Sequence, residues 1–191
     1  PGLAHERQTR KMTDGKPVAR VVVASTRASR GLYVDRSGPI IAEWLTARGF
    51  VVDEVDVVAD GAPVGDAIRA GIYASDALVI TTGGTGFTGR DVTPEAIEPL
   101  FEKRMDGFSI AFHMMSHAKI GTSTIQSRAT AGVAGATYIF CLPGSPGACR
   151  DAWDEILVHQ LDYRYRPCNF VELMPRLDEG LRRAKAQGAT A

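Results

Sequence analysis

Three glycines lie within the six residues Thr81–Gly86 (TTGGTG), directly after an apolar run. Because glycine has no Cβ, the chain can turn sharply here and its backbone can approach a ligand closely. Consecutive backbone N–H groups in such a turn can form an anion-binding concavity, assisted by threonine hydroxyls. A simple strand-exit turn is the alternative. The residues expected to bind a phosphate are Thr82, Gly83, Gly84, Thr85 and Gly86.

Two aspartates could complete this phosphate site. Asp91 follows the glycine turn, next to Arg90, and Asp60 follows the second expected strand of the chain, at residues 50–58. A carboxylate beside a phosphate is unfavourable unless a cation lies between them, and Mg²⁺ prefers oxygen ligands. Each aspartate alone could be an ordinary loop or capping residue. Together they predict a Mg²⁺-nucleotide site with Asp60 and Asp91 as metal ligands.

A second rigid turn, Pro143–Gly147 (PGSPG), follows another apolar run and precedes an expected helix. The N-terminus of a helix can receive an anion through its unpaired N–H groups. A further polar pair, Ser127 and Arg128, could also reach the site, since a guanidinium clamps phosphates well. The additional phosphate-binding candidates are therefore Pro143, Gly144, Ser145, Gly147, Ser127 and Arg128.

Two other nucleotide motifs can be tested against the glycine turn. A P-loop requires a lysine after its last glycine, and none is present. Residues 84–89 match G-x-G-x-x-G, but the next helix is expected only from Pro94, because proline disfavours a helical Thr93. We therefore interpret the match as accidental. A nucleotide-dependent oxidoreductase remains the alternative that rests on it.

Two further constellations carry weaker signals. Ser145 has Pro143 two residues before it, where a nucleophile elbow requires glycine, so a serine hydrolase is not favoured. His113 and His117 are four residues apart on an expected helix, but the glutamate of H-E-x-x-H and a third ligand are missing. This spacing predicts a partly buried helical pair rather than a zinc site.

Apolar runs and amphipathic segments alternate along the chain. We expect strands at residues 20–27, 50–58, 76–81 and 136–142, and helices from Ser37, Pro63, Pro94, Phe108 and Ala148. Strands that are apolar on both faces and alternate with helices predict a three-layer α/β/α sandwich with a mostly parallel sheet. In such sheets ligands gather beyond the carboxyl ends of the strands.

Composition sets the remaining expectations. The 191 residues suffice for one domain, and 22 Lys and Arg balance 22 Asp and Glu, so neither nucleic acid nor a membrane is an expected partner. Three cysteines without a C-x-x-C pair favour the cytoplasm. No apolar run approaches a membrane span, and the polar start is no secretory signal. We expect a flexible segment at 1–17, one domain at 18–175 and a helical or flexible tail at 176–191.

Four segments together resemble the MogA/MoaB family of molybdenum cofactor biosynthesis: 81–86 (TTGGTG), 90–96 (RDVTPEA), 120–134 (IGTSTIQSRATAGVA) and 142–148 (LPGSPGA). The resemblance covers residues 19–175. It implies a trimer or hexamer and Mg²⁺-dependent transfer of AMP from ATP to molybdopterin. By motif, the family's two essential aspartates correspond to Asp60 and Asp91, and its anion-binding loops to Gly83–Gly86 and Pro143–Gly147. Those loops would contact phosphate or pterin.

The chain departs from the family pattern around Phe108. Where the family usually has Pro-Gly-Phe-Gly-Glu and then an arginine, this chain has Asp-Gly-Phe-Ser-Ile at 106–110 and His113. This departure leaves a second possibility open, a non-catalytic pterin-binding or assembly protein of the same fold. The resemblance does not distinguish a molybdenum pathway from a tungsten pathway.

Overall fold

A central sheet of seven strands organises the computed structural model, which describes residues 11–179. Four strands run parallel in the order β3 (Val51–Val58), β2 (Lys16–Ala24), β4 (Leu78–Thr82) and β7 (Thr137–Leu142). The antiparallel strands β6 (Thr130–Ala134) and β5 (Lys103–Arg104) extend the sheet beyond β7, and β1 (Met12–Thr13) pairs antiparallel with the start of β2. The predicted mostly parallel sheet is confirmed; β1, β5 and β6 were not predicted.

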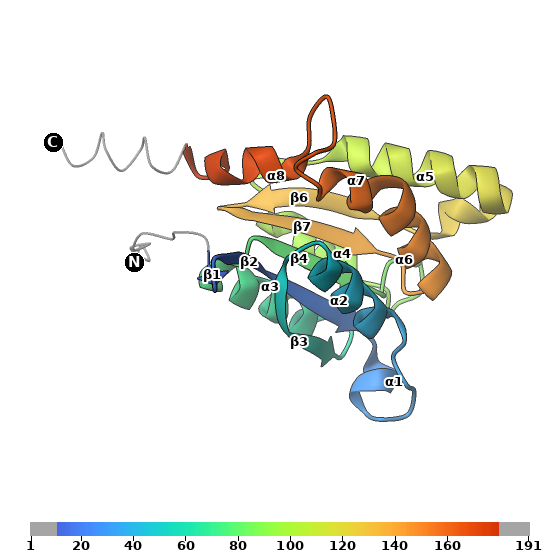
Figure 1. Cartoon of the computed structure of the whole chain (residues 1–191). Coiled ribbons are helices and arrows are strands. Elements are labelled where there is room, and N and C mark those ends of the chain that lie inside the picture. Colours follow the sequence, from blue (N-terminus) through green and yellow to red (C-terminus); the bar gives the residue numbers. More distant parts are fainter. Residues whose placement is uncertain (1–10, 180–191) are drawn as a thin grey trace, which may run out of the picture.

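Helices cover both faces of this sheet, which makes the predicted three layers (Figure 1). One face carries α2 (Ser37–Ala47), α5 (Asp106–Ile120), α6 (Pro146–Ala152) with its π-helical continuation η3 (Trp153–Leu157), α7 (Val158–Gln160) and α8 (Phe170–Leu173). The other face carries α3 (Ala62–Ala74) and α4 (Thr93–Ile97). The short helices α1 (Thr26–Ser29), η1 (Glu98–Leu100), η2 (Gly121–Gln126) and η4 (Met174–Arg176) lie in the connections.

Alternate strand residues feed two separate hydrophobic clusters, as the period of two in a β-strand requires. In β7, Tyr138, Phe140 and Leu142 join the cluster under α2, α5 and α6, whereas Ile139 and Cys141 join the cluster under α3 and α4. The central strands are therefore apolar on both faces because both faces are covered.

Two local expectations are corrected by the structure. Ser37 does not cap α2 through its side chain; Asp35 accepts hydrogen bonds from the N–H groups of Ser37 and Gly38, and the Ser37 hydroxyl donates to the Gly144 carbonyl. Residues 11–17, part of the segment expected to be flexible, contain β1 and the start of β2, which pair as a hairpin. The other parts of the predicted termini, residues 1–10 and 180–191, lie outside the described residues.

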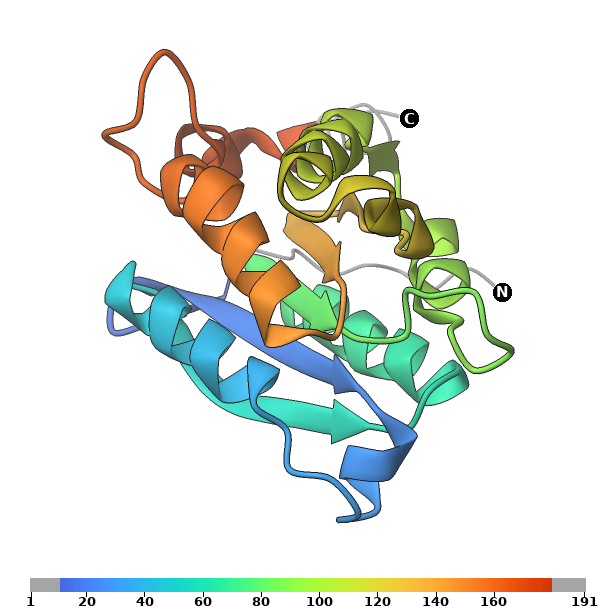
Figure 2. The same cartoon turned by 90° about the vertical axis from the view of Figure 1, so that its right-hand side faces the viewer.

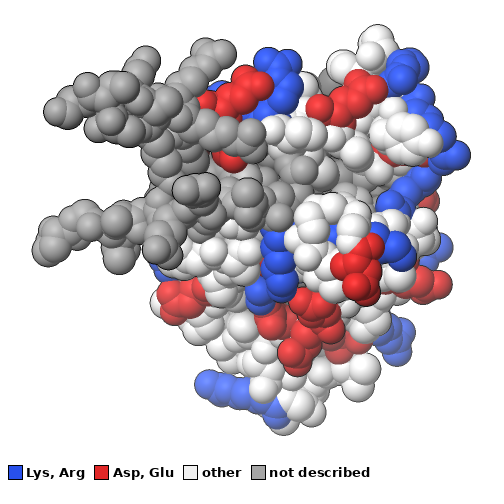
Figure 3. Space-filling view, turned by 60° about the vertical axis from the view of Figure 1, so that its left-hand side comes forward, with Lys and Arg blue, Asp and Glu red and all other residues white. Residues whose placement is uncertain are grey.

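The distribution of charged side chains on the surface agrees with the equal numbers of basic and acidic residues. On the face drawn in Figure 3, basic and acidic side chains lie in small interspersed groups. Within residues 11–179, no helix has the length and apolar character needed to cross a membrane.

Candidate functional site

The four parallel strands end at the same level, at the edge that faces the viewer in Figure 2. Across the sheet, Val23 pairs with Thr82, which pairs with Leu142 on its other side. From β2 the chain forms β3 on one side and then β4 on the other side, so the order of the strands reverses at β2. Such a switch point leaves a crevice beyond the strand ends. A cavity of about 400 Å³ occupies this position, lined by residues that follow β2, β3, β4 and β7.

The turns after β4 and β7 meet at this cavity. Gly83 has φ +97°, and a Cβ there would collide with the carbonyl of Ala24. A Cβ on Gly144 would come within 3.1 Å of the Cα of Gly83. The Gly83 N–H donates to the Leu142 carbonyl at 3.1 Å, so this amide ties the two turns together. Glycine is required at these positions because two backbones approach each other without intervening side chains.

Asp60 follows β3 and is held by one residue of the segment after β2. The Thr26 N–H and Oγ1 donate to Asp60 Oδ2 at 2.9 and 2.6 Å. Thr26 thereby engages Oδ2 and leaves Oδ1 for other contacts. Asp60 Oδ1 lies 3.5 Å from the position that a Cβ on Gly84 would occupy. The carboxylate therefore faces the glycine turn.

Asp91 is held in the same way from the other side of that turn. The Thr88 N–H and Oγ1 donate to Asp91 Oδ2 at 2.9 and 2.6 Å. The hydrogen bond from the Thr88 hydroxyl, with the N–H groups of Thr88 and Gly86, lowers the pKa of Asp91 below its ordinary value. Asp91 Oδ2 lies 2.9 Å from the position of a Cβ on Gly86. Asp60 and Asp91 thus face positions two residues apart in one turn.

Arg128 binds the glycine turn itself. Its Nε donates to the carbonyls of Thr85 and Gly86 at 3.2 and 3.1 Å, and its Nη2 donates to the Asp91 carbonyl at 2.6 Å. Its Nη1 forms an ion pair with Glu95. The guanidinium thus holds the loop in shape, and Arg128 does not line the cavity.

The structure divides the residues predicted from the sequence into two groups. The cavity is lined by Thr82, Gly83, Gly84, Gly144, Asp60 and Asp91. The other predicted residues are not among those that line it: Thr85, Gly86, Ser127, Arg128, Pro143, Ser145 and Gly147. Among them, the Ser145 hydroxyl accepts from the Ala148 N–H and caps α6. Ser127 has a buried hydroxyl that finds no hydrogen-bond partner among residues 11–179.

The part of the cavity wall that follows β2 was not predicted from the sequence. Ser25, Thr26, Arg27, Tyr33 and Asp35 all line the cavity. A usable signal existed, because the first strand of a parallel sheet ends at the same edge as the others. The segment has no glycine-rich turn immediately after its strand, so it did not stand out.

Neither His113 nor Ile110 lines the cavity. His113 Nδ1 lies 2.7 Å from the Ser109 carbonyl and Nε2 lies 3.0 Å from the Ser127 carbonyl, so the ring links α5 to the end of η2. Ile110 is 60% exposed on α5. Within residues 11–179, no three His, Cys, Asp or Glu side chains form a group able to hold a metal.

These features define a doubly wound α/β domain with a polar cavity at its topological switch point. A family model described as "Probable molybdopterin binding domain" matches residues 20–163, and the chain belongs to this family of molybdenum cofactor biosynthesis. The Molybdenum cofactor biosynthesis protein B of Escherichia coli (strain K12) is 44% identical over 153 residues, which cover 79% of this chain and 90% of that protein.

Two further relatives carry different names. The Molybdopterin adenylyltransferase of Pyrococcus furiosus is 37% identical over 134 residues, covering 68% of this chain and 79% of that protein. The solved structure of the molybdopterin biosynthesis Mog protein from Mycobacterium ulcerans superposes with a TM-score of 0.69 at 43% identity, covering 76% of this chain and 97% of that one. Both branches of the predicted family are therefore among the relatives.

Proposed function

We propose that this protein catalyses Mg²⁺-dependent transfer of AMP from ATP to molybdopterin. The observation that carries the proposal is the placement of Asp60 and Asp91, which face one glycine turn and line one cavity. The name of the Pyrococcus furiosus relative, Molybdopterin adenylyltransferase, supports the same reaction.

The carboxylate pair fits a magnesium ion. Mg²⁺ is commonly held by one or two carboxylates together with substrate phosphates and water, so two carboxylates without a third protein ligand are sufficient. Thr26 and Thr88 each bind Oδ2 of their aspartate, which fixes both carboxylates without neutralising them. When bound, the ion would neutralise charge on the nucleotide phosphates.

The other residues of the cavity would position the reactants. Attack of a phosphate on the α-phosphorus of ATP needs alignment and charge stabilisation more than covalent help. The attacking phosphate is already ionised, so no general base is required. Gly83, Gly84 and Gly144 let phosphates approach the backbone closely, because no Cβ intervenes. Arg128 binds the carbonyls of Thr85 and Gly86, so the N–H groups of the glycine turn stay in one orientation.

An assay of AMP transfer from labelled ATP to molybdopterin tests this proposal. We expect Asp60→Asn and Asp91→Asn each to reduce turnover by about a hundredfold or more, the size of effect seen when a preorganised charge-stabilising group is removed. The matched control is Asp66→Asn, at an exposed position on α3, which should retain full activity. No turnover by the wild-type protein, beside an active family member assayed in parallel, would refute the proposal.

The second candidate function is pterin binding without catalysis, as an assembly protein. It is favoured by Ile110 and His113, which stand where the family usually has glutamate and arginine. The position of both residues outside the cavity favours the enzyme instead, because neither departure alters the cavity wall. Binding of molybdopterin by the wild-type protein without AMP transfer would support this candidate.

A homotrimer or homohexamer in the cytoplasm is part of the same proposal. Light scattering that returned a monomer mass would reject the oligomer.

A further inference from the structure

The cavity has a second wall of different chemistry, formed by the segment after β2. Tyr33 is the one aromatic side chain among the described residues that line the cavity. α1 and the loop after it project beyond the edge of the sheet in both views (Figure 1 and Figure 2). The wall near the glycine turns offers backbone and the carboxylates of Asp60 and Asp91, whereas this wall adds an aromatic ring to its polar side chains.

Three successive large apolar side chains in this loop are uncovered. Leu32, Tyr33 and Val34 are 69%, 52% and 78% exposed. Of the three, Tyr33 lines the cavity, so its exposed ring stands where a bound ligand could contact it. Tyrosine supplies a large contact area with few rotatable bonds, which suits it to this role.

Arg27 lies over the same ring. Its Cζ is 5.9 Å from the centroid of the Tyr33 ring, and it also lines the cavity. Arg20 and Arg128 each form an ion pair with a carboxylate, whereas no carboxylate among residues 11–179 pairs with Arg27. An uncommitted guanidinium beside an aromatic face can stack on a further planar ring or contact a phosphate.

The size of the cavity leaves room for a ring as well as phosphates. Pockets of about 300 to 1,000 Å³ hold ligands of drug size, and this cavity measures about 400 Å³. We propose that Tyr33, flanked by Arg27, is the specificity-determining residue that stacks on the planar heteroaromatic ring of the phosphorylated substrate. This inference rests on the proposed function, because it assigns the ring end of the ligand whose phosphates lie at the glycine turns.

Calorimetric titrations with ATP and with inorganic tripolyphosphate, each with Mg²⁺, separate ring binding from phosphate binding. We expect Tyr33→Leu to weaken ATP binding about tenfold, a typical loss for one base stacked on an aromatic residue, and to leave tripolyphosphate binding unchanged. Tyr33→Phe should bind ATP as the wild type does, because it keeps the ring. Tyr163→Leu, another exposed tyrosine remote from this cavity, is the matched control.

A third titrant, a pterin phosphate, identifies the ring. If Tyr33→Leu weakens the binding of ATP alone, the nucleobase is the ring that stacks on Tyr33. If it weakens the binding of the pterin phosphate alone, the pterin is that ring. The inference is overturned if Tyr33→Leu weakens neither, if it weakens tripolyphosphate equally, or if the wild type binds neither ring-bearing compound better than tripolyphosphate. Ring-dependent binding without AMP transfer would refute the proposed function and leave this inference standing.

Discussion

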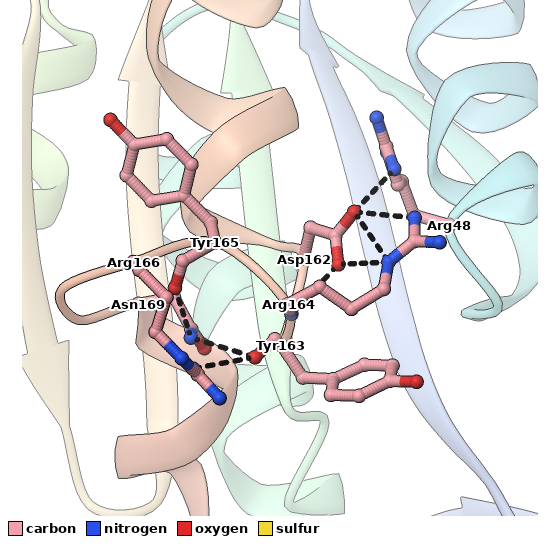
Figure 4. A network of polar contacts seen from close by, with 7 residues as sticks. All are labelled: Arg48, Asp162, Tyr163, Arg164, Tyr165, Arg166 and Asn169. Atoms are coloured by element: carbon pink, nitrogen blue, oxygen red, sulfur yellow. Dashed lines mark hydrogen bonds and ion pairs between the residues drawn. The ribbon is translucent and has the colours of Figure 1, made fainter.

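The two ends of the sheet hold their charged groups in opposite ways. Toward the amino ends of the strands, charges neutralise one another: Arg20 binds Asp56 and Asp76, and Arg48 and Arg164 both bind Asp162 (Figure 4). At the carboxyl ends, threonines hold the carboxylates of Asp60 and Asp91, and among residues 11–179 no cation forms an ion pair with either of them.

Because of this difference, we expect the charged groups at the amino ends to contribute to stability and those at the carboxyl ends to contribute to ligand binding. A hydrogen bond from a neutral hydroxyl orients a carboxylate and leaves its charge available to a ligand, whereas an arginine cancels that charge. The amino ends can therefore be altered with loss of stability and no loss of activity per folded molecule. The carboxyl ends should show the reverse.

The largest effect on stability is expected from Arg20→Met. Asp76 has a side chain that is 1% exposed, and burial raises the pKa of its carboxyl even though Arg20 opposes the shift. Removing Arg20 leaves a buried charge, whose nearest remaining described cation, Lys11, lies 4.0 Å from Oδ1. We expect the free energy of unfolding to fall by about 3 kcal/mol, measured by urea denaturation.

The pH dependence of that loss distinguishes a buried charge from lost packing. A group with a raised pKa in the folded state stabilises the fold below its unfolded pKa and ceases to do so as the pH rises through the folded value. The deficit of Arg20→Met should therefore shrink as the pH falls and Asp76 is protonated. Arg69→Met, on the exposed face of α3, should leave the midpoint unchanged. Equal shifts in the two variants would contradict the argument.

A smaller effect is expected from Thr88→Val at the other end of the sheet. The variant removes the hydroxyl that donates to Asp91, so the lowered pKa of Asp91 should move back toward its ordinary value. A depressed carboxyl pKa stabilises the fold above the unfolded pKa, and the effect is lost as the pH falls through the folded value. The variant should lose about 1 kcal/mol at neutral pH and nothing in acid, by urea denaturation.

Activity gives the more informative readout for Thr88→Val. AMP transfer should fall, though less than in Asp91→Asn, because the carboxylate remains but is no longer fixed. Thr46→Val is the control, since its hydroxyl donates to the Ala42 carbonyl on the solvent-exposed side of α2. Full activity of Thr88→Val would show that orientation of Asp91 does not matter.

The carboxyl-end contacts illustrate what the sequence could predict. Asp60, Gly83, Gly84 and Gly144 follow strands directly, so the geometry of a parallel sheet brings them together from local pattern alone. Arg128 could not be assigned in this way. Its partners are carbonyls about 40 residues away, and nothing local decides whether a guanidinium binds a ligand or the backbone behind it.

The sheet shows the same limit. β2, β4 and β7 were predicted because apolar runs are typical of strands buried on both faces, and β3 was predicted from its β-branched valines. β6 consists of Thr-Ala-Gly-Val-Ala, five residues that are all buried yet mostly small. A Cβ on Gly132 would collide with the ring of Phe101. Its composition is thus set by packing against a distant residue, and its strand propensity is weak.

The smallest effect is expected from Arg164→Gln. Arg164 is mostly exposed, and its hydrogen bonds keep the pKa of Asp162 well below the ordinary range. Exposed ion pairs contribute little, and Arg48 still neutralises Asp162 when Arg164 is removed. The urea midpoint of this variant should match that of the wild type, and Arg48→Gln should behave similarly for the same reason.

The double variant Arg48→Gln/Arg164→Gln sharpens the comparison. Each single substitution leaves one arginine on Asp162, whereas the double substitution removes both. If mutual neutralisation is what the amino ends contribute, the double variant should be less stable than the sum of the singles predicts, because groups that share a partner couple. AMP transfer per folded molecule should not change. Additive effects would mean that each arginine stabilises the fold through its own packing. The charged groups at the two ends of the sheet would then differ only in how deeply they are buried.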